Sequence, residues 1–174
     1  MDQLARMRML LKKDIRWKRF RSIMKNAWQP TLETNIDEIK TLHAGRSART
    51  LAGKLPTGKR VADASARDIM VRSRCVEIAM DAVVIAELMN SALGAVSKYV
   101  ETRYSNEMKR MGLTGVNERK AMVTTLLNSY YDKHDEVKTI IKIADMVIAD
   151  CDKTSFGLRH MVESLAVATR REGL

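Results

Sequence analysis

The sequence of 174 residues has few aromatic side chains, with two Phe, two Trp and four Tyr. It also has no series of aromatic and β-branched runs separated by turns every ten residues or so, which a β-sandwich requires. Its apolar residues are instead rich in Ala and in Met, of which there are 12. Both residue types fill the seams between packed helices. The composition therefore predicts an all-α protein.

Cysteine and histidine are scarce, with two Cys and three His. Cys75 and Cys151 both fall on apolar faces of predicted helices, so buried free thiols are favoured over a disulfide, as suits a reducing compartment. His43, His134 and His160 lie in three different predicted elements, without metal-ligand spacing or a paired nucleophile. We expect His134 to lie in a helix seam. We therefore expect no enzyme activity, no metal site and no cofactor.

No apolar run approaches 18 residues, and the first 25 residues are too charged for a secretory signal. We therefore expect that no segment spans a membrane. The expected location is the cytoplasm, which is the host cytoplasm if the protein is viral, or a virion if the protein is structural.

Proline is absent from residues 62–108, where Gly94 is the only glycine. Read as a helix, this stretch carries two apolar stripes with spacings of three and four. The first stripe is Ile69, Val76, Ala79, Val83, Ala86, Leu93, Val100 and Tyr104; the second is Cys75, Ile78, Ala82, Ile85, Met89, Ala92, Val96 and Tyr99. Such a helix would be roughly 65 Å long, against some 30–35 Å for a compact domain of this size. This predicts packing against other copies of the chain, and a break near Gly94 is the alternative.

A second long helix is expected from Asn117, a good N-cap after the turn at Gly112 and Gly115, to about Cys151. Its heptad-like stripe predicts an antiparallel hairpin with the helix over 62–108. The stripe consists of Val123, Leu126, Tyr130, His134, Val137, Ile141, Ala144, Ile148 and Cys151. A break at residues 152–154 precedes a predicted C-terminal helix, whose inward residues are Phe156, Leu158, Met161, Val162, Leu165 and Ala168.

Charge is distributed unevenly along the chain, whose net charge is +10. Residues 1–60 hold 15 Lys and Arg against 5 Asp and Glu, whereas residues 61–174 hold 16 of each kind. The whole excess therefore lies in the first third. The sequence predicts a basic N-terminal arm and loop over 1–60 and a neutral helical oligomerisation body over 61–174, as expected of a protein that binds a polyanion.

Within the arm, residues 3–28 predict one basic amphipathic helix, whose apolar stripe is Leu4, Met7, Leu11, Ile15, Phe20, Met24 and Trp28. Trp17 lies off this stripe among the cations, where it could stack on a base. Residues 31–43 predict a short acidic helix, and residues 45–60 a basic loop that could follow a phosphate backbone. The candidate nucleic-acid-binding residues are Arg6, Arg8, Lys12, Lys13, Arg16, Trp17, Lys18, Arg19, Arg21, Lys25, Arg46, Arg49, Lys54, Lys59 and Arg60.

The sequence of the arm is also compatible with three other roles. The helix could dock on the body with its charges solvated, lie on an anionic membrane, or bind a partner protein. The loop could be a plain linker between the arm and the body.

Three segments resemble the tailed-phage recombination mediator proteins of the UvsY type. SFGLRHMVE at 155–163 is similar to the C-terminal signature of that family, IIKIADMVIADCDKT at 140–154 to its oligomerising helix, and KYVETRYS at 98–105 to the tyrosine-rich end of its earlier long helix. Together these segments comprise 32 of the 174 residues, all between residues 98 and 163. Ser164 departs from the pattern, in which an aromatic residue often follows the acid, and the basic arm is longer than the family needs. The resemblance implies a helical ring of several subunits that binds single-stranded DNA and helps to load a recombinase.

The sequence thus predicts a non-enzymatic, oligomeric nucleic-acid-binding protein, with single-stranded DNA favoured and RNA or duplex as other ligands. A recombinase is a candidate protein partner. The alternative is a viral structural protein, of a nucleocapsid, coat or packaging type, whose basic arm neutralises nucleic acid. A third interpretation is a membrane-surface adaptor.

Overall fold

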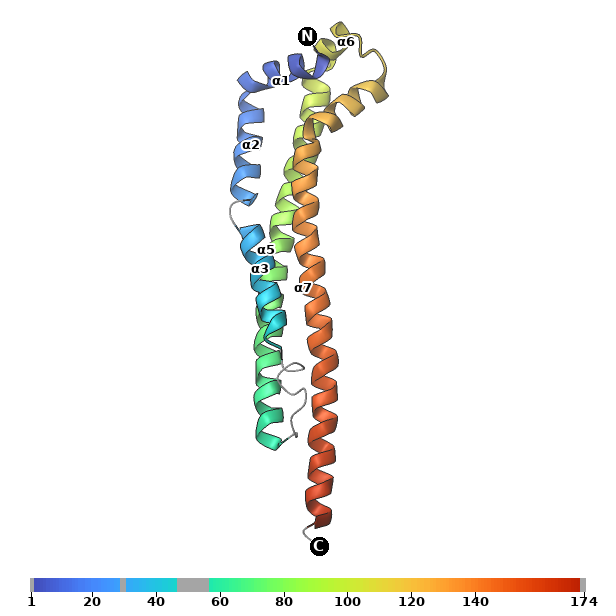
Figure 1. The fold of residues 1–174 in the computed structure, drawn as a ribbon. Helices are drawn as coiled ribbons and strands as arrows, with labels where there is room; N and C mark the ends of the chain where they lie inside the picture. The colour runs from blue at the N-terminus through green and yellow to red at the C-terminus, as the bar shows by residue number, and fades with distance from the viewer. Residues whose placement is uncertain (1, 29–30, 47–56, 173–174) are drawn as a thin grey trace. The chain divides into compact units, whose positions relative to one another are not determined.

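A computed structural model describes residues 2–28, 31–46 and 57–172 (Figure 1). These residues are almost entirely helical and contain no strand, which confirms the predicted all-α class. The helices are α1 (Gln3–Lys13), α2 (Ile15–Trp28), α3 (Thr31–Ala44), α5 (Gly58–Arg103), α6 (Ser105–Arg110) and α7 (Val116–Glu172). The short acidic helix predicted over 31–43 is confirmed as α3.

The chain forms two compact units. The first consists of Met1–Leu32 and Val83–Lys138, and the second of Glu33–Ala82 and Thr139–Leu174. The long helices α5 and α7 each contribute one part to either unit. Helices α1, α2 and α6 belong to the first unit, and α3 belongs to the second from Glu33 onward. Both units draw on the predicted arm over 1–60 and on the predicted body over 61–174.

The long helix predicted over 62–108 is confirmed as α5, which runs through Gly94 without a break and ends at Arg103. A Cβ atom added at Gly94 would meet nothing within 4 Å, so the helix tolerates this glycine on an open face. The second predicted stripe is largely buried. The first is only partly so, because the side chains of Ile69 and Val83 are 59% and 39% exposed.

By length and composition, α5 could cross a membrane. An 18-residue window within it has a mean hydropathy of 1.5, and 33% of that window is buried; no other described helix meets the same criterion. This window still contains charged and polar residues, so it is not an uninterrupted apolar run, and the expectation that no segment spans a membrane stays a prediction. The core helices of soluble proteins also reach this hydropathy, and part of the apolar surface of α5, including Met80 and Val84, is exposed.

The turn between α6 and α7 is set by Gly112, whose φ of +91° favours glycine. The amide of Leu113 donates to the carbonyl of Met108, and that of Gly112 to the carbonyl of Lys109, each at 3.0 Å. This pair of bonds is a Schellman motif, which satisfies the last carbonyls of α6. Glu118 accepts a hydrogen bond of 2.9 Å from the amide of Gly115 and so caps α7, which begins one residue before the predicted Asn117.

Helix α7 continues without interruption to Glu172, so the break predicted at residues 152–154 and the separate C-terminal helix are wrong. The hydroxyl of Thr154 donates to the carbonyl of Asp150 at 2.9 Å, within the helix. Arg72 of α5 pairs with Asp152 at 2.7 Å, within the second unit. These bonds engage side chains that would otherwise favour the end of a helix.

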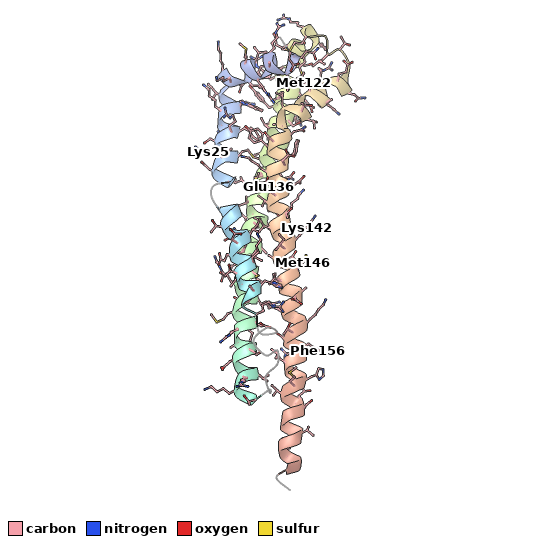
Figure 2. All side chains as sticks on the ribbon, viewed as in Figure 1. Lys25, Met122, Glu136, Lys142, Met146 and Phe156 are labelled. Atoms are coloured by element: carbon pink, nitrogen blue, oxygen red, sulfur yellow. The ribbon has the colours of Figure 1, made fainter. Side chains whose placement is uncertain are left out.

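The heptad-like stripe of α7 is confirmed over most of its length. Six of its nine members are buried and three are partly buried, namely Tyr130, Ile141 and Ile148. Beyond Cys151, Leu158 is buried with Val61 and Ala64 of α5, in the second unit. Phe156, Met161 and Val162 are exposed, so the prediction that they face inward is wrong, and the side chains of Leu165 and Ala168 lie outside the described residues. Figure 2 shows Phe156 and Met146 pointing away from α7.

Candidate nucleic-acid interface

The basic segment over residues 3–28 consists of two helices, because Asp14 separates α1 from α2. The carboxylate of Asp14 accepts a hydrogen bond of 2.9 Å from the amide of Trp17, which caps α2. Its other oxygen accepts bonds from the hydroxyls of Tyr99 at 2.7 Å and Tyr104 at 2.6 Å. The prediction of one continuous helix is therefore wrong, and this acid holds the α1–α2 elbow against the end of α5.

The hydrogen bonds to Asp14 lower the pKa of its carboxyl group. Burial raises the pKa of this carboxyl, but the bonds from Tyr104, the Trp17 amide and Tyr99 outweigh burial, so the pKa lies below its ordinary value. The same contacts raise the pKa of Tyr99, chiefly through its bond to the carboxylate. Asp14 is thus a charged anchor at neutral pH, not a partner for the surrounding cations.

The break at Asp14 also changes which residues of α2 face inward. Trp17, Phe20 and Met24 are buried, whereas Ile15, a predicted member of the stripe, is 81% exposed. Trp17 is 8% exposed, and its ring centroid lies 5.4 Å from that of Phe20 and 6.3 Å from that of Tyr130. The prediction that Trp17 is open to a base is therefore wrong, because α2 starts a new register and turns this ring into the first unit. The side chain of Trp28 lies outside the described residues.

The cations of α1 and α2 remain at the surface. All nine are exposed, namely Arg6, Arg8, Lys12, Lys13, Arg16, Lys18, Arg19, Arg21 and Lys25. The guanidinium of Arg16 lies 4.8 Å from the centre of the Tyr99 ring, a cation–π distance. No ion pair engages any of the nine within the described ranges. Their charge is therefore available to an anionic ligand.

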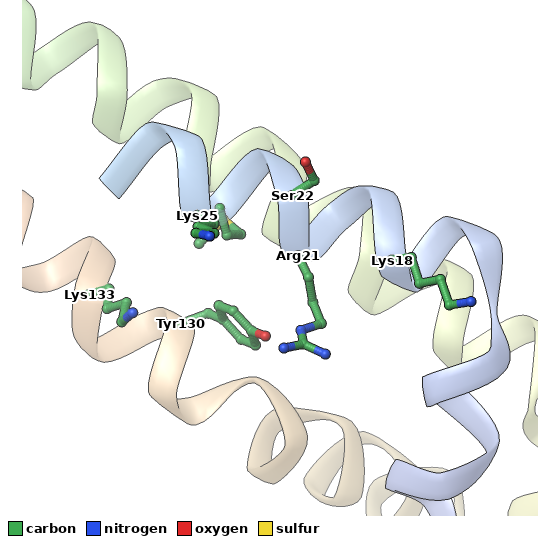
Figure 3. Close-up of a pocket in the computed structure, with 7 residues that line it drawn as sticks. Lys18, Arg21, Ser22, Lys25, Tyr130 and Lys133 are labelled. Carbon is green, nitrogen blue, oxygen red and sulfur yellow. The ribbon is translucent and has the colours of Figure 1, made fainter. Parts of the chain in front are cut away.

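A groove of about 640 Å³ runs between α2 and α7 in the first unit (Figure 3). Its lining residues are Lys18, Arg21, Ser22, Met24, Lys25, Tyr130 and Lys133. The three cations of α2 recur at spacings of three and four, which places them on one face of the helix. Figure 3 shows Arg21 and Tyr130 extending toward one another across the gap between the two helices.

A second groove, of about 350 Å³, adjoins the first and shares Arg21 and Tyr130 with it. Its lining residues are Arg8, Lys12, Trp17, Arg21, Leu126, Ser129 and Tyr130. No Asp or Glu of the described chain lines either groove. We call the two together the cationic groove. It unites five predicted cations, Arg8, Lys12, Lys18, Arg21 and Lys25, with two α7 residues that the sequence did not single out for binding, Tyr130 and Lys133.

The cations of the predicted basic loop behave differently. Arg46 is 4% exposed, forms an ion pair with Asp150 and donates a hydrogen bond of 2.8 Å to the hydroxyl of Thr154. The prediction that Arg46 binds nucleic acid is therefore wrong, because its charge is used inside the second unit. Lys59 and Arg60 are exposed at the start of α5. Arg49 and Lys54 lie outside the described residues.

The remaining titratable groups are placed in helix seams. His134 is 6% exposed, burial lowers its pKa, and it has a hydrogen bond to the backbone of Ala86. This is the predicted seam position. Cys75 and Cys151 are free, buried thiols, as predicted. The described residues contain no group of three or more His, Cys, Asp or Glu side chains that could hold a metal ion.

Comparison of the chain with protein-family models, with curated proteins and with solved structures finds no match.

Proposed function

We propose that this protein binds nucleic acid without catalysing a reaction, and that the cationic groove of the first unit is the binding surface. The observation that carries the proposal is the alignment of Lys18, Arg21 and Lys25 along one wall of a groove, with Lys133 on the other wall and no acid among the lining residues. A surface that only needed to be soluble would intersperse charges of both signs.

Phosphate contacts account for the expected affinity. Each Lys or Arg that neutralises a phosphate releases condensed counterions, and this term supplies nearly all of non-specific nucleic-acid binding. The three cations of α2 span about 10 Å along the helix axis, a length that covers about three phosphates of a stacked strand. The groove is therefore suited to follow a short stretch of backbone.

The resemblance to the UvsY-type proteins supports a finer assignment within the same proposal. In this assignment, the protein is a mediator that binds single-stranded DNA, assembles from several copies and acts with a recombinase. A packaging protein of a virion would use the same cations. The two roles differ in whether single strands are preferred to duplex.

The proposal is tested with two triple variants of equal charge. In the groove variant, Gln replaces Lys18, Arg21 and Lys25. In the control variant, Gln replaces Arg6, Lys13 and Arg19, which do not line the groove. Binding to a fluorescent single strand is measured by anisotropy over a range of salt concentrations. The groove variant should lose affinity and flatten the log–log salt slope by about 2, because each single-strand phosphate contributes about 0.7. Equal losses in both variants would contradict a groove site.

A further inference from the structure

We propose that Tyr130 of α7 is the side chain on which an unpaired base stacks, and that Lys133 supplies a phosphate contact beside it. This inference rests on the proposed function and adds a specificity-determining residue to it. The sequence predicts this stacking role for Trp17, but the side chain of Trp17 is buried.

Tyr130 occupies the centre of the cationic groove. It lines both parts of the groove and shares this position only with Arg21 among the described lining residues. Its side chain is partly exposed, and its hydroxyl end points into the space between α2 and α7 (Figure 3). A base placed here would meet an aromatic ring next to a guanidinium.

The ring of Tyr130 is also held in place. Its centroid lies 4.9 Å from that of Phe20, with an interplanar angle of 67°, and 6.3 Å from that of Trp17, at 87°. Both are edge-to-face arrangements, which aromatic pairs prefer. The two buried rings thus orient Tyr130, so that a base stacking on it would not first have to order the side chain.

Lys133 follows Tyr130 by three residues and therefore lies on the same face of α7. It extends the α7 wall of the groove opposite the α2 row of cations. A strand in this groove would have its backbone near the cations and a base against the ring. Every base has a π-face, so this contact tolerates any sequence, but a duplex keeps both faces of its bases stacked. The geometry therefore favours unpaired over paired nucleic acid.

The experiment compares Tyr130→Leu with Tyr130→Phe and Tyr131→Leu in the full chain, using oligo-dT of about 15 nucleotides and a duplex of the same length. Tyr131 is also partly buried but does not line the groove. Tyr130→Leu should weaken single-strand binding by about 5- to 100-fold with an unchanged salt slope, since stacking is not ionic. Tyr130→Phe and Tyr131→Leu should bind as the parent does, and duplex binding should be the same in all four proteins.

A second measurement separates stacking from folding. Thermal unfolding, followed by circular dichroism, identifies any variant that is partly unfolded, and affinities are then expressed per folded molecule. Lys133→Gln should reduce the salt slope by about 0.7, whereas Lys120→Gln, an exposed α7 control outside the groove, should not. If Tyr130→Leu binds single strands normally while the α2 triple variant does not, the stacking inference is wrong and the proposed function stands. If neither changes binding, both are wrong.

Discussion

At the scale of single residues, Asp14 links the two basic helices to Tyr99 and Tyr104. It is the only acid between Gln3 and Trp28, and its carboxylate accepts three hydrogen bonds that connect α2 to the end of α5. A cation-rich helix pair would otherwise have little to hold it in one position except its apolar face. The same contacts leave the nine neighbouring cations without this acid as a partner.

Asp14→Asn should lower the free energy of unfolding by about 1–3 kcal/mol at neutral pH, because hydrogen bonds to a charged group are lost or weakened. The pKa of Asp14 is lower in the folded protein than in the unfolded chain. The ionised carboxylate therefore stabilises the folded state fully above the ordinary carboxyl pKa of about 3.9, and this stabilisation is lost as pH falls through the lower pKa of the folded protein. Urea denaturation at neutral pH and near pH 2 measures both effects. The difference between the two proteins should shrink in acid.

Asp37→Asn is the matched control, because Asp37 is 74% exposed and pairs only with Lys40, at 3.3 Å, among the ion pairs of the described chain. Its effect should stay within about 0.5 kcal/mol, as is usual for surface pairs. An equally small effect of Asp14→Asn would show that the tyrosine contacts contribute nothing to stability.

The two cysteines should react slowly with thiol reagents in the native protein. Both are fully buried, and burial raises the pKa of Cys75 and of Cys151, so little thiolate forms at neutral pH. Labelling followed by mass spectrometry should show slow modification that becomes fast in denaturant. Rapid labelling of both thiols without denaturant would contradict their seam positions.

Some of these residue roles could be predicted from the sequence and others could not. The seam positions of Cys75, Cys151 and His134 follow from spacing along one helix, which is local information. The burial of Trp17 and Arg46 depends on residues more than 80 positions away, Tyr130 in one case and Asp150 in the other. Composition carries no information about such distant partners. It therefore predicts that Trp17 and Arg46 lie at the surface among the cations.

At the scale of elements, glycine positions test the continuity of the long helices. Gly94→Ala in α5 and Gly157→Ala in α7 should each raise the free energy of unfolding by about 0.5–1 kcal/mol, because both sites are helical and the new methyl group meets nothing within 4 Å. Gly112→Ala should destabilise instead, since its φ of +91° is strained for any other residue. Thermal unfolding of the three variants measures both signs. A loss of stability at Gly94 would favour the broken helix.

The existence and type of the long helices could be predicted, but some of their ends could not. Periodicity located α5 and α7 because apolar residues repeat over many turns. Asp14 and residues 152–154 are both polar and favour helix ends. A break occurs only at Asp14, and the difference lies in the partners of these side chains. Asp14 is drawn out of the helix by two tyrosines, whereas Asp152 pairs with Arg72 from within it. Tertiary contacts decide between these outcomes.

At the scale of the whole molecule, we expect the chain to associate with itself. Large apolar side chains remain exposed on α5, among them Met80 at 65% and Val84 at 66%. These two residues are one helical turn apart, and burying such surface gains about 25 cal/mol per Å² before the cost of association. Sedimentation at tens of micromolar should show an oligomer, which Met80→Gln with Val84→Gln should weaken. Met9→Gln with Ile15→Gln, exposed on another part of the chain, is the control, and a monomeric parent protein would contradict the expectation.

We propose that the cationic groove binds nucleic acid through the phosphates of its backbone. The most direct test is the affinity of the full chain for a single-stranded oligonucleotide, measured by anisotropy between about 50 and 200 mM salt, with anionic lipid vesicles as a parallel ligand. We expect a linear log–log dependence with a slope of about −4, from the six cations of the groove at about 0.7 each, and vesicles that compete poorly. No binding at the lowest salt concentration, or binding to vesicles alone, would contradict it.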